Sequence, residues 1–311
     1  MLCVFFNAMY GMKKVEEKKY VFDSGESVFV RARLFSLESL NELKNTLTIF
    51  LPGWSMGVDD ATVHILCSEF SDYTKTPTIA IETYANNSLT NKLIASDTKY
   101  DLLHEEALAI SLYIKELGIK NVRVVGYSLG GDKAIHLVSI LQNDINIKIE
   151  GLVLLDTVGL YTQKPLKLMV GFIKDLFVSF MKGFSRHSAV PTNVKNVGLQ
   201  FATDMLWRWV HDVRRAGAKY PARLAHEVAE MTNRNPYMKE ITVPVVLISG
   251  ADDKISDLTQ FSEKYGKTLF PQSKTVSLFT PKELGQHGLP FYRPAFVVRT
   301  SITALARTHK E

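Results

Sequence analysis

Cysteine is scarce in this sequence, because Cys3 and Cys67 are the only two among 311 residues. Two cysteines in a chain of this length exclude a disulfide framework, and neither belongs to a Cys-x-x-Cys pair. The fold must therefore rest on a hydrophobic core, which a chain with 46% apolar residues can supply. A reducing compartment is expected, and we predict a cytoplasmic location.

Two apolar segments lack the features of targeting or membrane sequences. Residues 1–10 have no basic residue before their apolar part, and the first lysines follow it, so a signal peptide is not indicated. The apolar stretch 165–184 carries Lys174 and Asp175 near its middle, where a transmembrane helix would exclude charge. We predict an amphipathic helix there.

The sequence has little excess charge outside one segment. Lys and Arg total 37 against 32 Asp and Glu, a net charge of +5. Residues 161–240 hold 13 basic and 6 acidic residues, a net of +7, which leaves −2 for the rest of the chain. No nucleic-acid motif accompanies this basic segment, and its aromatic residues fall at helical spacing. A nucleic-acid partner is therefore not expected.

The most informative stretch is Val122–Gly131, with the sequence VRVVGYSLGG. Its valines predict a buried strand, and an apolar-periodic helix is predicted at 129–141. A Gly-x-Ser-x-Gly motif at a strand-to-helix turn is typical of a nucleophile in a strained backbone conformation, with which flanking Cβ atoms would collide. The turn would expose the Ser128 hydroxyl and present the Leu129 amide, at the helix N-terminus, to an oxyanion.

Around this turn, apolar runs alternate with amphipathic helical patterns, which indicates a doubly wound α/β fold with a mostly parallel sheet. A strand at 47–51 stops at Pro52-Gly53-Trp54, a glycine loop in which the Trp54 amide is the candidate second oxyanion donor. Further strands are predicted at 20–23, 27–35, 77–84, 122–126, 151–155, 243–250 and 275–279, and further helices at 97–117, 257–267 and 294–305.

The strand–helix alternation stops after Asp156 and resumes at Val243. This interruption predicts that residues 161–240 are a helical insertion in one core made of residues 1–160 and 241–311. Helices are predicted in the insertion at 165–184, 199–217 and 222–231, each with an apolar stripe. Packing of these apolar faces against the core would explain them without any ligand. We expect that they pack in this way and that the same apolar surface also covers a pocket.

A serine hydroxyl needs a base, and a group that orients the base, before it can act as a nucleophile. Among the eight histidines, His287 falls in a glycine-flanked loop after a late strand, whereas the others are assigned to helices, to the insertion or to the C-terminal tail. For the acid we choose Asp253, in the turn SGADD that follows an apolar strand. One of the two aspartates in that turn would also cap the next helix, and Asp156 is the alternative acid.

These motifs resemble the α/β-hydrolase superfamily. The turns GYSLGG, SGADD and the loop QHG place Ser128, Asp253 and His287 in the chain order of that family's triad. The resemblance covers nearly the whole chain apart from the N-terminal segment and the insertion, which corresponds to the family's helical lid. One departure bears on the Trp54 donor: residues 52–53 are Pro-Gly, where many members have His-Gly.

The resemblance implies a serine hydrolase that cleaves a carboxylic ester through an acyl-serine intermediate. Ser128, Asp253 and His287 would be catalytic, the Trp54 and Leu129 amides would bind the oxyanion, and no metal or organic cofactor is needed. A small-molecule acyl ester is the expected substrate, and the basic insertion would attract an acidic carrier protein or an anionic membrane surface. The alternative is a non-catalytic binding protein or receptor of the same fold for a small hydrophobic ligand.

Overall fold

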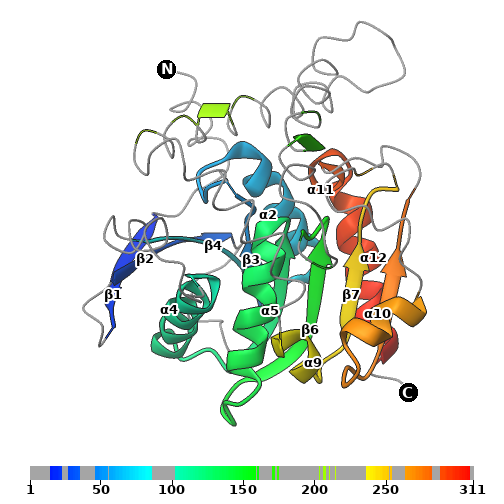
Figure 1. Ribbon diagram of the computed structural model, residues 1–311. Helices are drawn as coiled ribbons and strands as arrows, with labels where there is room; N and C mark the ends of the chain where they lie inside the picture. Colours follow the sequence, from blue (N-terminus) through cyan, green and yellow to red (C-terminus); the bar gives the residue numbers. More distant parts are fainter. Residues whose placement is uncertain are drawn as a thin grey trace, which may run out of the picture.

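The computed structural model describes most of the predicted core. The described residues are 15–22, 27–35, 46–54, 56–85, 102–158, 160, 236–251, 253, 263–281 and 288–308, together with 170, 171, 174, 203, 206, 207, 210 and 214. Their strands form one sheet with helices on both faces (Figure 1).

The sheet has eight strands in the order β1-β2-β4-β3-β5-β6-β7-β8. The pairs β1–β2 and β2–β4 are antiparallel, and all the other neighbours are parallel. The carboxyl ends of β3 to β8 therefore meet at one edge of the sheet. The strands are β1 Glu16–Val21, β2 Ser27–Phe35, β3 Leu47–Leu51, β4 Thr78–Ala85, β5 Asn121–Tyr127, β6 Lys148–Leu155, β7 Val245–Ile248 and β8 Val276–Phe279.

Two layers of helices enclose the sheet (Figure 1). On one face lie α4 (Leu102–Glu116), α5 (Leu129–Leu141), α9 (Pro236–Glu240) and α10 (Glu263–Leu269). On the other lie α2 (Ala61–Thr74), α11 (Leu289–Tyr292) and α12 (Pro294–Thr308).

The central strand β5 contributes side chains to both helical layers. Val122 and Val124 belong to the core under α4 and α5, whereas Val125 and Tyr127 belong to the core under α2 and α12. Because successive residues of a strand point to opposite faces, a strand covered on both sides needs a continuous apolar run. This explains why the pattern at 122–127 is unbroken by charge except at Arg123.

The predicted strands are confirmed, and Ser27–Phe35 and Leu47–Leu51 have the predicted bounds. The prediction for β7 was too long, because Pro244 has no amide for the ladder and a turn begins at Ser249. Helix α2 has no counterpart among the predicted elements, and α9 and α11 are too short to be seen in periodicity. The three predicted helices of the insertion lie largely outside the described residues.

Strand β1 forms the outer edge of the antiparallel part of the sheet. It begins at Glu16, four residues before the predicted start. Its first four residues are two glutamates followed by two lysines. Lys18 Nζ lies 3.0 Å from Glu116 Oε2 of α4, and the Tyr20 hydroxyl donates to the same oxygen at 3.1 Å. These contacts fasten the edge strand to the helical layer.

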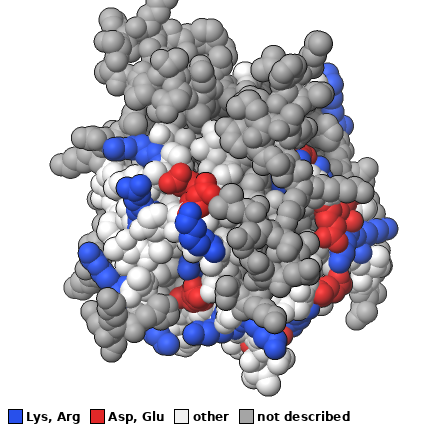
Figure 2. All heavy atoms as spheres, turned by 180° about the vertical axis from the view of Figure 1, so that it is seen from behind, with Lys and Arg blue, Asp and Glu red and all other residues white. Residues whose placement is uncertain are grey.

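The described surface carries both signs of charge. Seen from the side of α2 and α12, basic and acidic side chains of the described residues are intermingled (Figure 2). No helix in the described part of the chain is long and apolar enough to cross a membrane.

Candidate active site

Ser128 lies at the turn between β5 and α5 with a backbone φ of +52°. Residues with a Cβ rarely adopt this region, so the conformation is held by its surroundings. The Ser128 amide donates to Leu155 O of β6 at 2.9 Å, and the Ser128 carbonyl accepts from the Gly131 amide at 3.0 Å. The strained turn is thus fixed from the sheet and from the helix, and the Ser128 side chain is half-buried rather than enclosed.

The two glycines of the motif allow α5 to approach the sheet closely. A Cβ on Gly130 would lie 2.1 Å from Leu51 O, and a Cβ on Gly126 would lie 2.4 Å from Gly130 O. The sequence motif predicted that these glycines avoid a collision with Ser128. The nearest obstacles are instead the end of β3 and the backbone of α5, so the glycines are needed for helix–sheet packing.

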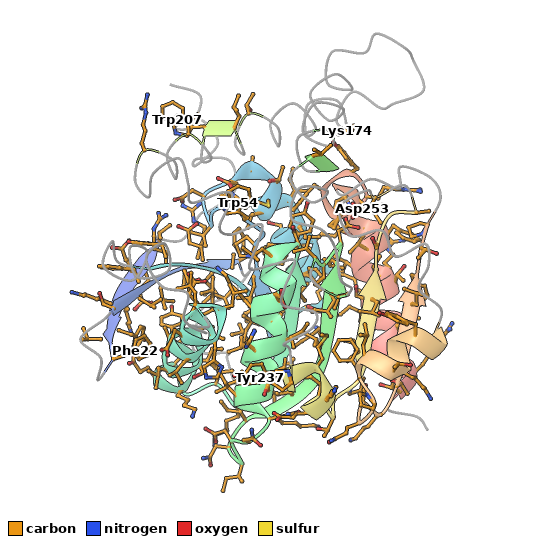
Figure 3. All side chains as sticks on the ribbon, in the orientation of Figure 1. Phe22, Trp54, Lys174, Trp207, Tyr237 and Asp253 are labelled. Carbon is orange, nitrogen blue, oxygen red and sulfur yellow. The ribbon has the colours of Figure 1, made fainter. Side chains whose placement is uncertain are left out.

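The loop after β3 lies against the nucleophile turn. A Cβ added to Gly53 would be 3.0 Å from Ser128 Cβ and 3.0 Å from the Tyr127 ring, so the backbone at Gly53 lies directly beside Ser128. Trp54 is the next residue, and Figure 3 places it at the edge where the parallel strands end. On the other side of Ser128, Leu129 begins α5, whose first amides have no acceptor within the helix.

Asp253 follows β7 and is buried at this same edge (Figure 3). Its amide donates to Gly250 O at 3.0 Å, which closes a turn over residues 250–253. The Ala251 amide donates to Pro281 O at 3.0 Å. The turn with Asp253 is therefore tied to the chain that leaves β8 toward the predicted histidine loop.

Asp156 follows β6 and supports the same turn. It is fully buried, with a φ of +43°, and its Oδ1 accepts the Gly250 amide at 2.9 Å. Its own amide donates to Ile248 O at 2.8 Å. The sequence marked Asp156 as the alternative acid, but this hydrogen bond to the turn of Asp253 could not be read from the sequence.

His287 lies outside the described residues, and the chain resumes at Gly288. The amides of Phe291 and Tyr292 donate to Gly288 O at 3.0 and 3.2 Å, which forms the single turn α11. The buried ring of Phe291 meets the Tyr127 ring edge to face, with centroids 4.7 Å apart. The chain that follows His287 is therefore anchored to the residue before Ser128, a contact that the sequence analysis missed.

No protein-family model and no curated protein sequence matches the chain, whereas many solved structures do. A membrane phospholipase A shares 14% identity and a TM-score of 0.59 over 100% of this chain and 92% of that one. An esterase from Exiguobacterium antarcticum shares 15% identity and a TM-score of 0.57, over 93% and 99% of the two chains. The chain has the α/β-hydrolase fold.

The predicted fold class is thereby confirmed, but the α/β-hydrolase fold does not decide the chemistry. A bromoperoxidase from Bacillus anthracis is as similar to this chain as the esterase, with 15% identity and a TM-score of 0.58 over 94% and 100% of the two chains. The reaction must therefore be inferred from the residues at the strand ends.

The predicted insertion, residues 161–240, is described only at scattered positions before residue 236. Val170, Leu206, Trp207 and Arg214 are exposed there, with Trp207 at 69%. Lys174 and Trp207 lie beyond the edge of the sheet that carries Trp54 and Asp253 (Figure 3). Among all the described residues, no group of three or more His, Cys, Asp and Glu side chains is arranged to hold a metal ion.

Proposed function

We propose that this protein is a serine hydrolase that cleaves a carboxylic ester by acyl transfer to water. The observation that carries the proposal is Ser128 at φ +52° at the start of α5, with the backbone at Gly53 packed against its Cβ. This arrangement puts a hydroxyl between a helix N-terminus and a loop backbone, where amide groups can stabilise an oxyanion.

In the proposed mechanism, His287 takes the proton of the Ser128 hydroxyl as Oγ attacks the ester carbonyl carbon. The amides of Leu129 and Trp54 hold the oxyanion of the tetrahedral intermediate, and His287 then protonates the departing alcohol. Water, deprotonated by the same histidine, attacks the carbonyl carbon of the acyl-serine. The histidine then returns this proton to Ser128 Oγ as the acid is released. Asp253 orients His287 and stabilises its charged form.

An acyl ester is the proposed substrate class. The names of the similar structures, a phospholipase A and an esterase, support ester chemistry. We assign residues 161–240 as a lid over the site, and the exposed apolar side chains of Val170, Leu206 and Trp207 suit contact with an acyl chain. The basic residues of this lid would attract an anionic substrate or carrier.

The first prediction concerns the nucleophile. Ser128→Ala should abolish covalent labelling by a fluorophosphonate probe and hydrolysis of p-nitrophenyl esters of graded chain length, because the acyl group has no other acceptor. His287→Ala should lower kcat by about 10³-fold or more, as in other triads. Thermal unfolding of each variant checks that the fold persists, and labelling that continues in folded Ser128→Ala would place the nucleophile elsewhere.

The same assay separates an enzyme from a non-catalytic binding protein of this fold. A binding protein would bind hydrophobic esters without turnover, and its serine would stay unlabelled. Hydrolysis that depends on Ser128 excludes that alternative.

A further inference from the structure

The loop between β3 and α2, residues 52–60, is held at its middle by a buried carboxylate. The amide of Val58, a fully buried residue, donates to Oε2 of Glu82 on β4 at 2.9 Å. A buried amide in a loop has no ladder partner, and leaving it without an acceptor destabilises the fold. Glu82 supplies that acceptor.

The carboxylate of Glu82 is itself held by a cross-strand arginine. Arg31 of β2 stands directly opposite Glu82 in the antiparallel register, and its Nη1 forms an ion pair with Oε1. The Arg31 Nη2 also lies 2.8 Å from Asp59 Oδ2, next to Val58 in the loop. Burial opposes the charge on Arg31, but Glu82 and Asp59 outweigh it and raise the pKa of this guanidinium.

A second arginine on β2 and a histidine on α2 complete this support. Arg33 Nη2 lies 3.1 Å from Asp59 Oδ1, and Arg33 Nη1 donates to Nε2 of His64. Burial, and then the charge of Arg33, lower the pKa of His64 to about 4, so the ring is neutral near pH 7 and accepts this hydrogen bond. The same nitrogen lies 3.2 Å from Val58 O.

The path from this support to the nucleophile is short. The Met56 amide donates to Gly53 O at 3.2 Å, and the Gly57 amide donates to Asp60 Oδ2 at 2.7 Å. The loop is thus hydrogen-bonded on both sides of Val58, and its other end at Gly53 touches Ser128. A shift at Val58 would move the backbone at residues 53 and 54.

We propose that Glu82 is a positioning residue for oxyanion stabilisation, acting through Val58 on the loop that carries the Trp54 amide. The inference rests on the proposed function, because it concerns the same oxyanion. Glu82 acts through the Val58 amide, and it fixes where the loop amide lies before the reaction begins. Oxyanion donors act without reorganisation only if they are held in place, and a misplacement of about 1 Å can cost on the order of 10² in rate.

The test compares two changes at Glu82 with a matched change on β6, near the amino end of the parallel strands. Glu82→Leu removes the acceptor and the charge, whereas Glu82→Gln keeps an oxygen for the Val58 amide. The control, Glu150→Gln, breaks a similar ion pair with Arg123, whose Nη2 lies 2.7 Å from Glu150 Oε2 far from the loop. For each variant, kcat and KM on p-nitrophenyl butanoate are measured together with thermal unfolding and hydrogen exchange of the peptide 52–60.

Glu82→Leu should lower kcat by about 10²-fold with KM little changed, because the lost interaction acts in the transition state. Glu82→Gln should recover most of that loss, and Glu150→Gln should lower the unfolding temperature without lowering kcat. Hydrogen exchange in residues 52–60 should accelerate in Glu82→Leu and not in the control. Wild-type kcat in Glu82→Leu, or an equal loss in Glu150→Gln, would overturn the proposal.

Two further readouts keep the inference separate from the proposed function. If Glu82→Leu does not fold, Asp59→Asn replaces it, since Asp59 is partly exposed and pairs with both arginines. An unchanged kcat in Asp59→Asn then refutes the positioning role. If the wild type hydrolyses no ester and Ser128 stays unlabelled, the proposed function fails. In that case, unchanged hydrogen exchange of residues 52–60 in Glu82→Leu, or in Asp59→Asn where it replaces that variant, would refute the claim that Glu82 holds the loop.

Discussion

Two buried aspartates, Asp156 and Asp253, follow the neighbouring strands β6 and β7, and they make different hydrogen bonds. Asp156 after β6 directs Oδ1 at the Gly250 amide, so that oxygen is committed to the turn after β7. Asp253 ends that turn, which is closed by the hydrogen bond from its amide to Gly250 O. We propose that Asp253 orients His287 and that Asp156 supports the turn that carries Asp253.

This division gives the prediction for the acid. Asp253→Asn should lower kcat on the order of 10⁴-fold, because an amide cannot hold His287 in the required tautomer or stabilise its charge. Asp156→Asn should cost far less, since the amide oxygen can still accept the Gly250 N–H. Steady-state kinetics at saturating p-nitrophenyl ester measure both, with Asp252→Asn as the control. If kcat falls strongly in Asp156→Asn but not in Asp253→Asn, the catalytic acid is Asp156, after β6.

The candidate site could be predicted from the sequence where its signal is local. The Gly-x-Ser-x-Gly turn and the SGADD turn are each readable in a few consecutive residues, because turn geometry restricts residue type locally. The contacts of Glu82 with Arg31 and of Asp156 with Gly250 join residues 51 and 94 positions apart. Such pairs depend on strand order, which no local pattern specifies.

At the scale of elements, α2 links the loop of residues 52–60 to the body of the protein. Val63, Leu66, Cys67 and Phe70 recur at helical spacing and are fully buried on the inner side of α2. His64 lies near the start of the same helix and meets Arg33 of β2. The protonation state of His64 therefore matters for how α2 and β2 hold together.

We predict that the free energy of unfolding falls as the pH is lowered from about 6.5 to about 4. In that window the unfolded chain binds a proton on His64, while the folded chain, with the His64 pKa lowered to about 4, does not. Urea unfolding at pH 7 and pH 5 should show a larger loss for the wild type than for His64→Gln, which cannot titrate there. Equal losses in both proteins would contradict this assignment.

Element prediction succeeded for the strands because a sheet covered on both faces demands apolar runs. It failed for α2, although the spacing of its buried residues carried the signal, since the segment 61–74 also contains β-branched and polar residues that weaken a helical pattern. It also failed for α9 and α11, which have five and four residues. Helices of that length are defined by tertiary contacts, such as that between Phe291 and Tyr127.

At the scale of the whole molecule, the two ends of the parallel strands differ in chemistry. The carboxyl end carries Ser128 and the buried aspartates. Near the other end, Arg123 of β5 is paired with Glu150 and donates to Thr48 Oγ1 at 3.2 Å, and burial lowers the pKa of its guanidinium although Glu150 opposes this. The carboxyl end is therefore the proposed reaction site, whereas the described charges at the other end are paired within the sheet.

The charged side chains of β1 bear on whether two copies of the protein can pair through this outer strand. An outer strand exposes unpaired backbone groups on which a second molecule can extend the sheet, and charged side chains oppose that pairing. Replacing both Glu17 and Lys19 with valine should let β1 recruit other copies and produce oligomers in light scattering and gel filtration. As a control, replacing the exposed helical residues Asp72 and Lys267 with valine should leave the protein monodisperse. If the β1 variant also forms no oligomers, the charges of β1 are not what prevents strand pairing at this edge.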